Sequence, residues 1–355
     1  MALPSAPSMK TQLSRWENGH RVPDDLYRRL FREIFAMTDE QLGFEGSTVD
    51  VVPAGPVPSA LLGHFGVMLD QYAAADHIVG HGPLLVAAQD QASYLDRLAR
   101  HAAGPSRAEL LKLSARYAEF VGWLHQDSGD FTAATFWTDR AVECAHELDD
   151  AQALSYVLHR KSNIATDAGE AGRALGLAEA ALRHGDELTP RLRAVALRQK
   201  ANAQAMVGDR ESCARSLGDA LAEAHAGASA TRDDVASYCT PAYVDMETGN
   251  CWLTLGKAAK AVPFLERGLA EWPAGQDRDR GLCLSRLAAA HAHAGDLDAA
   301  ATAGLHSLEV VRGASSARSL SELRRVRAML AGSRTVEGAN EFEATFVALT
   351  RKSVA

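Results

Sequence analysis

The sequence predicts an all-α fold built from repeated pairs of helices, and three observations lead to this prediction. The chain is rich in Ala, Leu, Arg and Glu, which favour helices, and it has few clusters of β-branched residues. Apolar residues recur at intervals of three and four, the spacing of an amphipathic helix. Turns that contain glycine recur at nearly constant spacing. With 355 residues, 47% of them hydrophobic, the chain is long enough for an extended array with a substantial core.

The charge balance limits the kinds of partner that we expect. A net charge of −8 and a pI near 5.9 give no overall basic field, so contact with nucleic acid would need a local basic patch. The stretch from Lys10 to Arg32 is where we would look for such a patch. No run of about 18 apolar residues is present, and the first residues do not resemble a signal peptide, so we expect no membrane partner.

The cysteines indicate a reducing compartment. The chain has five of them, scattered without CxxC spacing, and an odd number would leave one thiol unpaired in a disulfide framework. We therefore expect reduced, mostly buried thiols in a cytoplasmic protein.

The first element along the chain is residues 11–23, TQLSRWENGHRVP. An amphipathic stretch at 27–35 and a short one at 40–44 follow it. This order, with a glycine stop and a proline after the first helix, resembles the second half of helix-turn-helix regulators of the Cro/repressor (Xre) class. The resemblance implies that residues at the start of the reading helix face base edges, where arginine and glutamine can make two hydrogen bonds to one base. These residues are Lys10, Thr11, Gln12 and Arg15, while Trp16 packs on the inner side.

The sequence departs from the Xre pattern upstream of this helix. The pattern needs two further helices there, one of which contacts the phosphate backbone. Here the preceding residues are MALPSAPS, and two prolines disfavour a helix. One interpretation places the true start about 30 residues upstream; a second is a degenerated domain in a chain that works without DNA. A third is an ordinary pair of capped helices. We assign 1–45 as a partial helix-turn-helix region and expect DNA as a partner only where that domain is complete in vivo.

A linker and a helical cap are expected next. Residues 51–59, VVPAGPVPS, contain three prolines and a glycine, so we place a linker at 46–59. Residues 60–104 have a helical pattern but lack the register of small residues described below. We expect them to form an N-terminal cap of the array, and 314–355 to form capping helices at its other end.

Five turn glycines, separated by 40, 39, 48 and 39 residues, mark a repeat between these caps. Small residues occur seven positions before, five after and twelve after every one of these glycines. Closely packed helices need small side chains where their backbones approach, so this register has a packing cause. The turn glycines are Gly129, Gly169, Gly208, Gly256 and Gly295; the small residues are Gly122, Ser162, Ala201, Gly249 and Ala288, then Ala134, Ala174, Cys213, Ala261 and Ala300, then Ala141, Ala181, Ala220, Gly268 and Ser307.

This register resembles that of tetratricopeptide repeats, with five units over residues 105–313. The units are longer than the usual ~34 residues, and they lack the proline that often ends a unit. The resemblance implies a right-handed tetratricopeptide-repeat superhelix preceded by the partial helix-turn-helix region. It also implies that the first helix of each pair lines a concave groove, which would hold a peptide, a small molecule or a partner protein.

The position after each early small residue should point into this groove, and three consecutive repeats have asparagine there. An asparagine ladder could hydrogen-bond an extended peptide backbone; the asparagines could equally serve to solvate an exposed helix face. The predicted groove residues are Trp123, Gln126, Tyr156, His159, Asn163, Arg198, Asn202, Tyr243, Asn250 and Arg286, and further polar positions are Arg116, Glu119, Arg160, Asp167 and His293.

No catalytic residue, metal ligand or cofactor is predicted. The stretch from Gly249 to Lys257 has six residues between its glycines instead of the four of a phosphate loop, and neither GxSxG nor HExxH occurs. We therefore predict a ligand-responsive transcriptional regulator and no enzyme. The alternatives are a DNA-free interaction scaffold derived from such a regulator, and an enzyme on a recycled repeat scaffold. A homodimer would place two reading helices one DNA turn apart.

Overall fold

The computed structural model describes Trp16, Pro23 and residues 25–35, 57–228, 234–273, 276–313, 316–331 and 336–352. Contacts between residues divide the chain into two units, Met1–Gly55 and Pro56–Ala355, and each is described by itself.

The first unit contains helix α2 (Asp25–Phe35). The ring of Trp16 packs against this helix, with its centroid 4.8 Å from that of Tyr27 and 5.7 Å from that of Phe31. Trp16 thus has the packing role that the resemblance implies. The residues expected to contact DNA lie outside the described part of the chain: Lys10, Thr11, Gln12 and Arg15.

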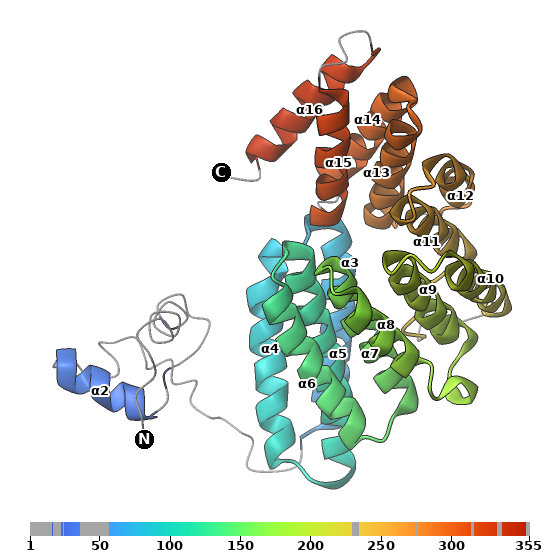
Figure 1. Cartoon of the computed structure of the whole chain (residues 1–355). Helices are drawn as coiled ribbons and strands as arrows, with labels where there is room; N and C mark the ends of the chain where they lie inside the picture. The colour runs from blue at the N-terminus through green and yellow to red at the C-terminus, as the bar shows by residue number, and fades with distance from the viewer. Residues whose placement is uncertain are drawn as a thin grey trace. The chain divides into compact units, whose positions relative to one another are not determined.

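The second unit consists of helices, and its described residues contain no strand (Figure 1). The predicted all-α superhelical repeat fold is therefore confirmed. None of the described helices is long and apolar enough to cross a membrane. In chain order the helices are α3 (Ser59–Val79), α4 (Gly82–His101), α5 (Gly104–Ser128), α6 (Phe131–Glu147), α7 (Ala151–Asp167), α8 (Ala171–Ala181), the 3₁₀ helix η1 (Gly185–Glu187), α9 (Pro190–Met206), α10 (Arg210–Ala226), α11 (Pro241–Thr254), α12 (Ala258–Ala270), α13 (Asp277–Ala294), α14 (Leu297–Gly313), α15 (Ala317–Leu330) and α16 (Ala339–Lys352).

The turn glycines and the small residues behave as their spacing predicts. Each of the five turn glycines joins two helices that pack on each other, and each has a φ between 68° and 89°, which only glycine adopts at low cost. All fifteen small residues are buried. A Cβ at Gly249 in α11 would lie 2.4 Å from Cγ of Leu265 in α12, and one at Gly122 in α5 would lie 2.7 Å from Oγ1 of Thr138 in α6. The register therefore marks where the two helices of a pair touch.

The odd-numbered helices of the second unit form an inner layer. Helices α5, α7, α9, α11 and α13 contact one another in this order, while α6, α8, α10 and α12 each pack on the odd-numbered helices before and after them. The layer closes on itself, because α13 contacts α3 and α15 contacts α5 (Figure 1). All the predicted groove residues lie on odd-numbered helices, so they share this layer.

The ends of the array are covered by further helices. Tyr117 of α5 is fully buried, and its hydroxyl lies 2.9 Å from the carbonyl oxygen of Phe65 in α3 and 2.8 Å from Oε1 of Gln91 in α4. At the other end α15 packs on α13, and α16 packs on α14. All five cysteines are free thiols and are buried, as expected.

Candidate functional site

A chain of hydrogen bonds, which we call the Glu119 network, crosses from α5 to α7. Arg160 donates from Nε to Oε1 of Glu119 at 2.7 Å and from Nη2 to Oε1 of Gln126 at 3.0 Å. Gln126 in turn donates from Nε2 to Oδ1 of Asn163 at 2.8 Å and to Oδ2 of Asp167 at 2.6 Å. Asp167 is exposed, so this network ends in a charged acceptor at the surface.

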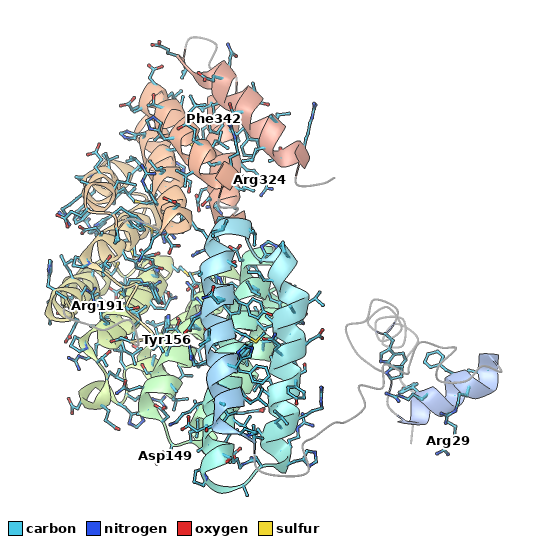
Figure 2. All side chains as sticks on the ribbon, turned by 180° about the vertical axis from the view of Figure 1, so that it is seen from behind. Arg29, Asp149, Tyr156, Arg191, Arg324 and Phe342 are labelled. Carbon is cyan, nitrogen blue, oxygen red and sulfur yellow. The ribbon has the colours of Figure 1, made fainter. Side chains whose placement is uncertain are left out.

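Aromatic side chains gather next to this network in what we call the tyrosine cluster: Tyr156, His159, Tyr238 and Tyr243 (Tyr156 is labelled in Figure 2). The ring centroids of Tyr156 and His159 are 4.8 Å apart, and those of Tyr238 and Tyr243 are 5.3 Å apart. The Tyr238 hydroxyl lies 3.4 Å from Nε2 of His159. Burial, with nearby arginines, lowers the pKa of His159 well below its ordinary value, so its imidazole is neutral.

A third group of polar residues centres on Glu247 of α11. Its Oε1 accepts a hydrogen bond from Nη1 of Arg286 at 2.9 Å, and its Oε2 accepts one from Nδ2 of Asn202 at 2.9 Å. Burial raises the pKa of Glu247, but Arg286 and Arg198 lower it more, to about 2. Glu247 is therefore a buried carboxylate that is charged at neutral pH, with both oxygens occupied.

The three asparagines of the proposed ladder have different surroundings within the chain. Asn163 bonds to Gln126 and, at 3.4 Å, to Oε1 of Gln199. Asn202 is 5% exposed; its Nδ2 donates to Oε2 of Glu247, and its Oδ1 accepts a hydrogen bond from Sγ of Cys251. Asn250 is half-buried and makes no side-chain hydrogen bond to any described residue. The same position in each repeat has different surroundings here, because the facing helices offer each asparagine different partners.

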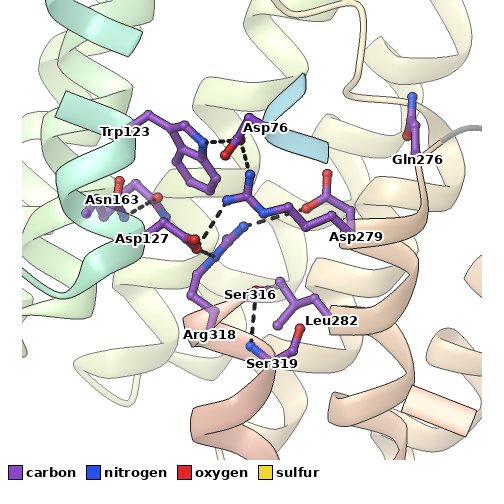
Figure 3. A network of polar contacts seen from close by, with 12 residues as sticks. Asp76, Trp123, Asp127, Asn163, Gln276, Asp279, Leu282, Ser316, Arg318 and Ser319 are labelled. Carbon is purple, nitrogen blue, oxygen red and sulfur yellow. Dashed lines mark hydrogen bonds and ion pairs between the residues drawn. The ribbon is translucent and has the colours of Figure 1, made fainter. Parts of the chain in front are cut away.

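Ion pairs join the two ends of the inner layer (Figure 3). Arg278 of α13 is paired with Asp76 of α3, and its Nη2 lies 3.1 Å from Oδ1 of Asp127 in α5. Arg318 of α15 lies 3.9 Å from Asp127 and 3.6 Å from Asp279. We call these five residues, with Trp123, the ring-closing network, since they connect helices from opposite ends of the array.

Trp123, a predicted groove residue, lies at the centre of this network. Its Nε1 donates to Oδ2 of Asp76 at 3.0 Å. Three guanidinium groups lie over its ring, with their carbons 4.8, 4.3 and 4.7 Å from the centroid for Arg160, Arg278 and Arg318. Such cation–π contacts hold the indole in one orientation.

Sequence reasoning missed most of the ring-closing network. Asp76, Arg278 and Arg318 lie outside the register positions that predict groove residues, and Arg278 is separated from Asp76 by 202 residues. Two of the additional polar positions do not join the inner networks: Arg116 pairs with Asp70 at 2.9 Å, and His293 is exposed.

A pocket of about 290 Å³ lies elsewhere, between α6, α7 and the start of α8. None of the predicted groove residues lines it. Its charged lining residues are already paired, Lys161 with Asp139 and Arg173 with Glu170, so it offers little for the recognition of a charged ligand.

Comparisons with known proteins show what the fold is similar to. No protein-family model and no curated protein matches this chain. The crystal structure of a Rap protein in complex with the competence and sporulation factor aligns with a TM-score of 0.51 at 14% identity, over 83% of this chain and 97% of that one. BtubC of P. vanneervenii aligns with a TM-score of 0.45 at 20% identity, over 72% of this chain and 93% of that one. A thermophilic TPR protein of Thermus thermophilus gives 0.43 at 20% identity, over 61% and 99%. At these identities the likeness to the Rap protein shows a shared fold.

Proposed function

We propose that this chain is a regulator that binds a peptide on the inner layer of its helical array. The observation that carries the proposal is the convergence of polar and aromatic side chains from successive odd-numbered helices on one layer, in the Glu119 network, the tyrosine cluster and the Glu247 group. Such a lining offers donors, acceptors and ring faces to an extended backbone. The complex of a Rap protein with the competence and sporulation factor supports the proposal, because that protein shares the fold.

A catalytic role receives less support. Nucleophilic catalysis needs a nucleophile with an adjacent base that a substrate can reach. The tyrosine cluster has a hydroxyl beside an imidazole, in Tyr238 and His159, but His159 is 0% exposed. We therefore keep binding as the proposed activity, for the ligand classes of peptide, small molecule or partner protein.

The binding test uses a degenerate pentapeptide library and mass spectrometry of the peptides that the protein retains. The double variant Tyr156→Ala/Asn163→Ala removes two half-buried groups of the inner layer, and we expect it to lose about tenfold or more in retention. The matched control Phe136→Ala removes a side chain that is 59% exposed on α6, and we expect no change. Equal retention by both variants would place the peptide elsewhere, and no retention by the wild type would refute peptide binding.

Regulation of transcription is proposed on the resemblance of residues 1–45 to Xre regulators. The test measures fluorescence anisotropy of DNA from the region upstream of the gene, over a salt series. A DNA contact made by Lys10, Thr11, Gln12 and Arg15 should weaken as salt rises, and Arg15→Ala should weaken it further. Binding that is undetectable at low salt would favour the DNA-free scaffold. Size-exclusion chromatography with light scattering of the same protein tests the homodimer.

A further inference from the structure

The described residues of the second unit include five buried arginines; three of them pair with carboxylates, and a fourth donates to two backbone carbonyl groups. A buried cation is tolerated when a carboxylate or several acceptors surround it. Arg160 has Glu119, Arg286 has Glu247, Arg278 has Asp76 and Asp127, and Arg191, which has no carboxylate among the described residues, donates to the carbonyl oxygens of Gly227 and Cys239 (Arg191 is labelled in Figure 2).

Arg198 of α9 is the exception. It is 3% exposed, and it forms no ion pair with any described residue. Its Nη1 donates to Oε1 of Gln199 at 3.0 Å, its guanidinium carbon lies 5.4 Å from the ring centroid of Tyr243, and its buried Nε has no acceptor within the described part of the chain. A guanidinium group can donate five hydrogen bonds, so most of its capacity is unused.

The order of charges along the array explains why this arginine is left over. Nine or ten residues before each turn glycine stand, in the five repeats, an acid, an arginine, an arginine, an acid and an arginine. The first two pair with each other, and the last two pair with each other. The arginine of the middle repeat is left without an acidic partner. In chain order these residues are Glu119, Arg160, Arg198, Glu247 and Arg286.

The nearby acid cannot neutralise Arg198 without losing its own partners. Both oxygens of Glu247 are occupied by Arg286 and Asn202. Burial lowers the pKa of Arg198, but Tyr243 and Glu247 raise it more, so the group stays charged. The middle of the inner layer therefore holds a fixed positive charge that no described carboxylate pairs with directly.

We propose that Arg198 is the carboxylate subsite of the inner layer and that a carboxylate group of the bound peptide pairs with its guanidinium. Tyr156 and Tyr238 are half-buried, whereas Tyr243 and His159 are buried, so we place the approach of the carboxylate on the side of Tyr156 and Tyr238. The ring of Tyr243 lies against the guanidinium of Arg198, whose carbon is 5.4 Å from the ring centroid. This inference rests on the proposed function, since it names the chemical group that a peptide ligand presents.

The test compares two forms of one probe, an N-acetylated degenerate pentapeptide library with either a free carboxyl terminus or a terminal amide. Wild-type protein should retain the free acids about 10- to 100-fold more than the amides, because the pair is charge-assisted and desolvated. Arg198→Met should lose this preference, and Arg198→Lys, which keeps the charge but not the planar fork, should keep part of it. Retained amides that contain Asp or Glu and depend on Arg198 would also support the subsite, with a side chain as the source of the carboxylate.

The failures of the two proposals are distinguishable. Wild-type protein that retains acids and amides equally, without dependence on Arg198, would overturn the carboxylate subsite and leave peptide binding standing. A wild type that retains neither form would overturn peptide binding and the subsite with it.

A second measurement needs no ligand. Arg198 has no directly paired carboxylate and only a longer-range attraction to Glu247, so Arg198→Met should lower the thermal midpoint much less than the loss of a directly paired arginine does. The matched variant Arg286→Met strands the buried carboxylate of Glu247 and should lower the midpoint by about 5 °C or more. If Arg198→Met lowers the midpoint as far as Arg286→Met does, the charge of Arg198 is compensated within the chain and the inference is wrong.

Discussion

The ring-closing network should hold the ends of the inner layer together, and Arg278→Met tests this directly. The change leaves the carboxylates of Asp76 and Asp127, which are 3% and 1% exposed, without their main cation. Asp127 keeps His81 at 3.3 Å and Arg318 at 3.9 Å, whereas Asp76 keeps only the indole N–H of Trp123 among the described residues. Removing one partner of a buried ion pair costs about 3–5 kcal/mol, so we expect Arg278→Met to lower the free energy of unfolding by this amount.

The double variant Asp76→Asn/Arg278→Met separates the ion pair from other effects. Asparagine removes one stranded charge and can still accept the hydrogen bond from Trp123. We expect it to recover about 1–3 kcal/mol of the loss in equilibrium urea unfolding, and the single variant Asp76→Asn completes the double-mutant cycle that gives the coupling energy of the pair. As a control, Arg215→Met on α10 removes an ion pair with Glu211 between two highly exposed side chains, and it should change nothing measurable.

The closure itself is measured by a distance between the two ends. Spin labels at Val67→Cys in α3 and Arg325→Cys in α15 occupy exposed positions, and the five native cysteines are buried and should not react. In Arg278→Met we expect the distance between labels to lengthen and its distribution to broaden. A variant that keeps both the distance and the free energy of unfolding of the wild type would refute the role of Arg278 in closure.

Two other substitutions test the packing and the electrostatics of the repeats. Gly249→Ala would place a Cβ 2.4 Å from Cγ of Leu265 and should destabilise the protein by about 1–3 kcal/mol. Gly218 is exposed on α10 with nothing within 4 Å of a Cβ, so Gly218→Ala should stabilise the protein by up to about 1 kcal/mol. Urea unfolding checks both variants, and an equal loss of stability in the two would contradict the packing argument. Glu247→Gln should destabilise at pH 7 by about 3 kcal/mol, because the folded pKa of Glu247 lies at about 2 instead of 4.5. A depressed pKa gives stability that is present above pH 4.5 and lost as pH falls toward 2, so the difference between the variant and the wild type should shrink over that range, and a constant difference would show that Glu247 does not titrate as argued.

The paired helices could be predicted because their signals are local. A turn glycine with positive φ and small residues at fixed distances from it follow from the contact between neighbouring helices, such as that of Gly249 with Leu265. The same register placed Trp123, Gln126 and Arg286 on the inner layer. It could not say which groups they would meet there, because each inner residue meets side chains from other repeats.

Closure of the layer has no local signal at all. It depends on the sum of small rotations from one repeat to the next, and an error of a few degrees in each would move α13 away from α3. Asp76 and Arg278 are ordinary residues of their own helices until that sum brings them together. The sequence therefore predicts the paired helices of the repeat but not the contact between the two ends of the array.

The unpaired positive charge of Arg198 on the inner layer could be predicted from the sequence only in part. The order of acid, arginine, arginine, acid and arginine can be read from the sequence, and it implies that one cation lacks a partner. The order alone does not say which arginine is unpaired, since Glu247 could pair with Arg198 before it in the chain or with Arg286 after it. The structure places Arg286 2.9 Å from one oxygen of Glu247 and Asn202 on the other. The unpaired cation thus falls in the middle repeat, beside the tyrosines, where a ligand that spans the inner layer would pass it.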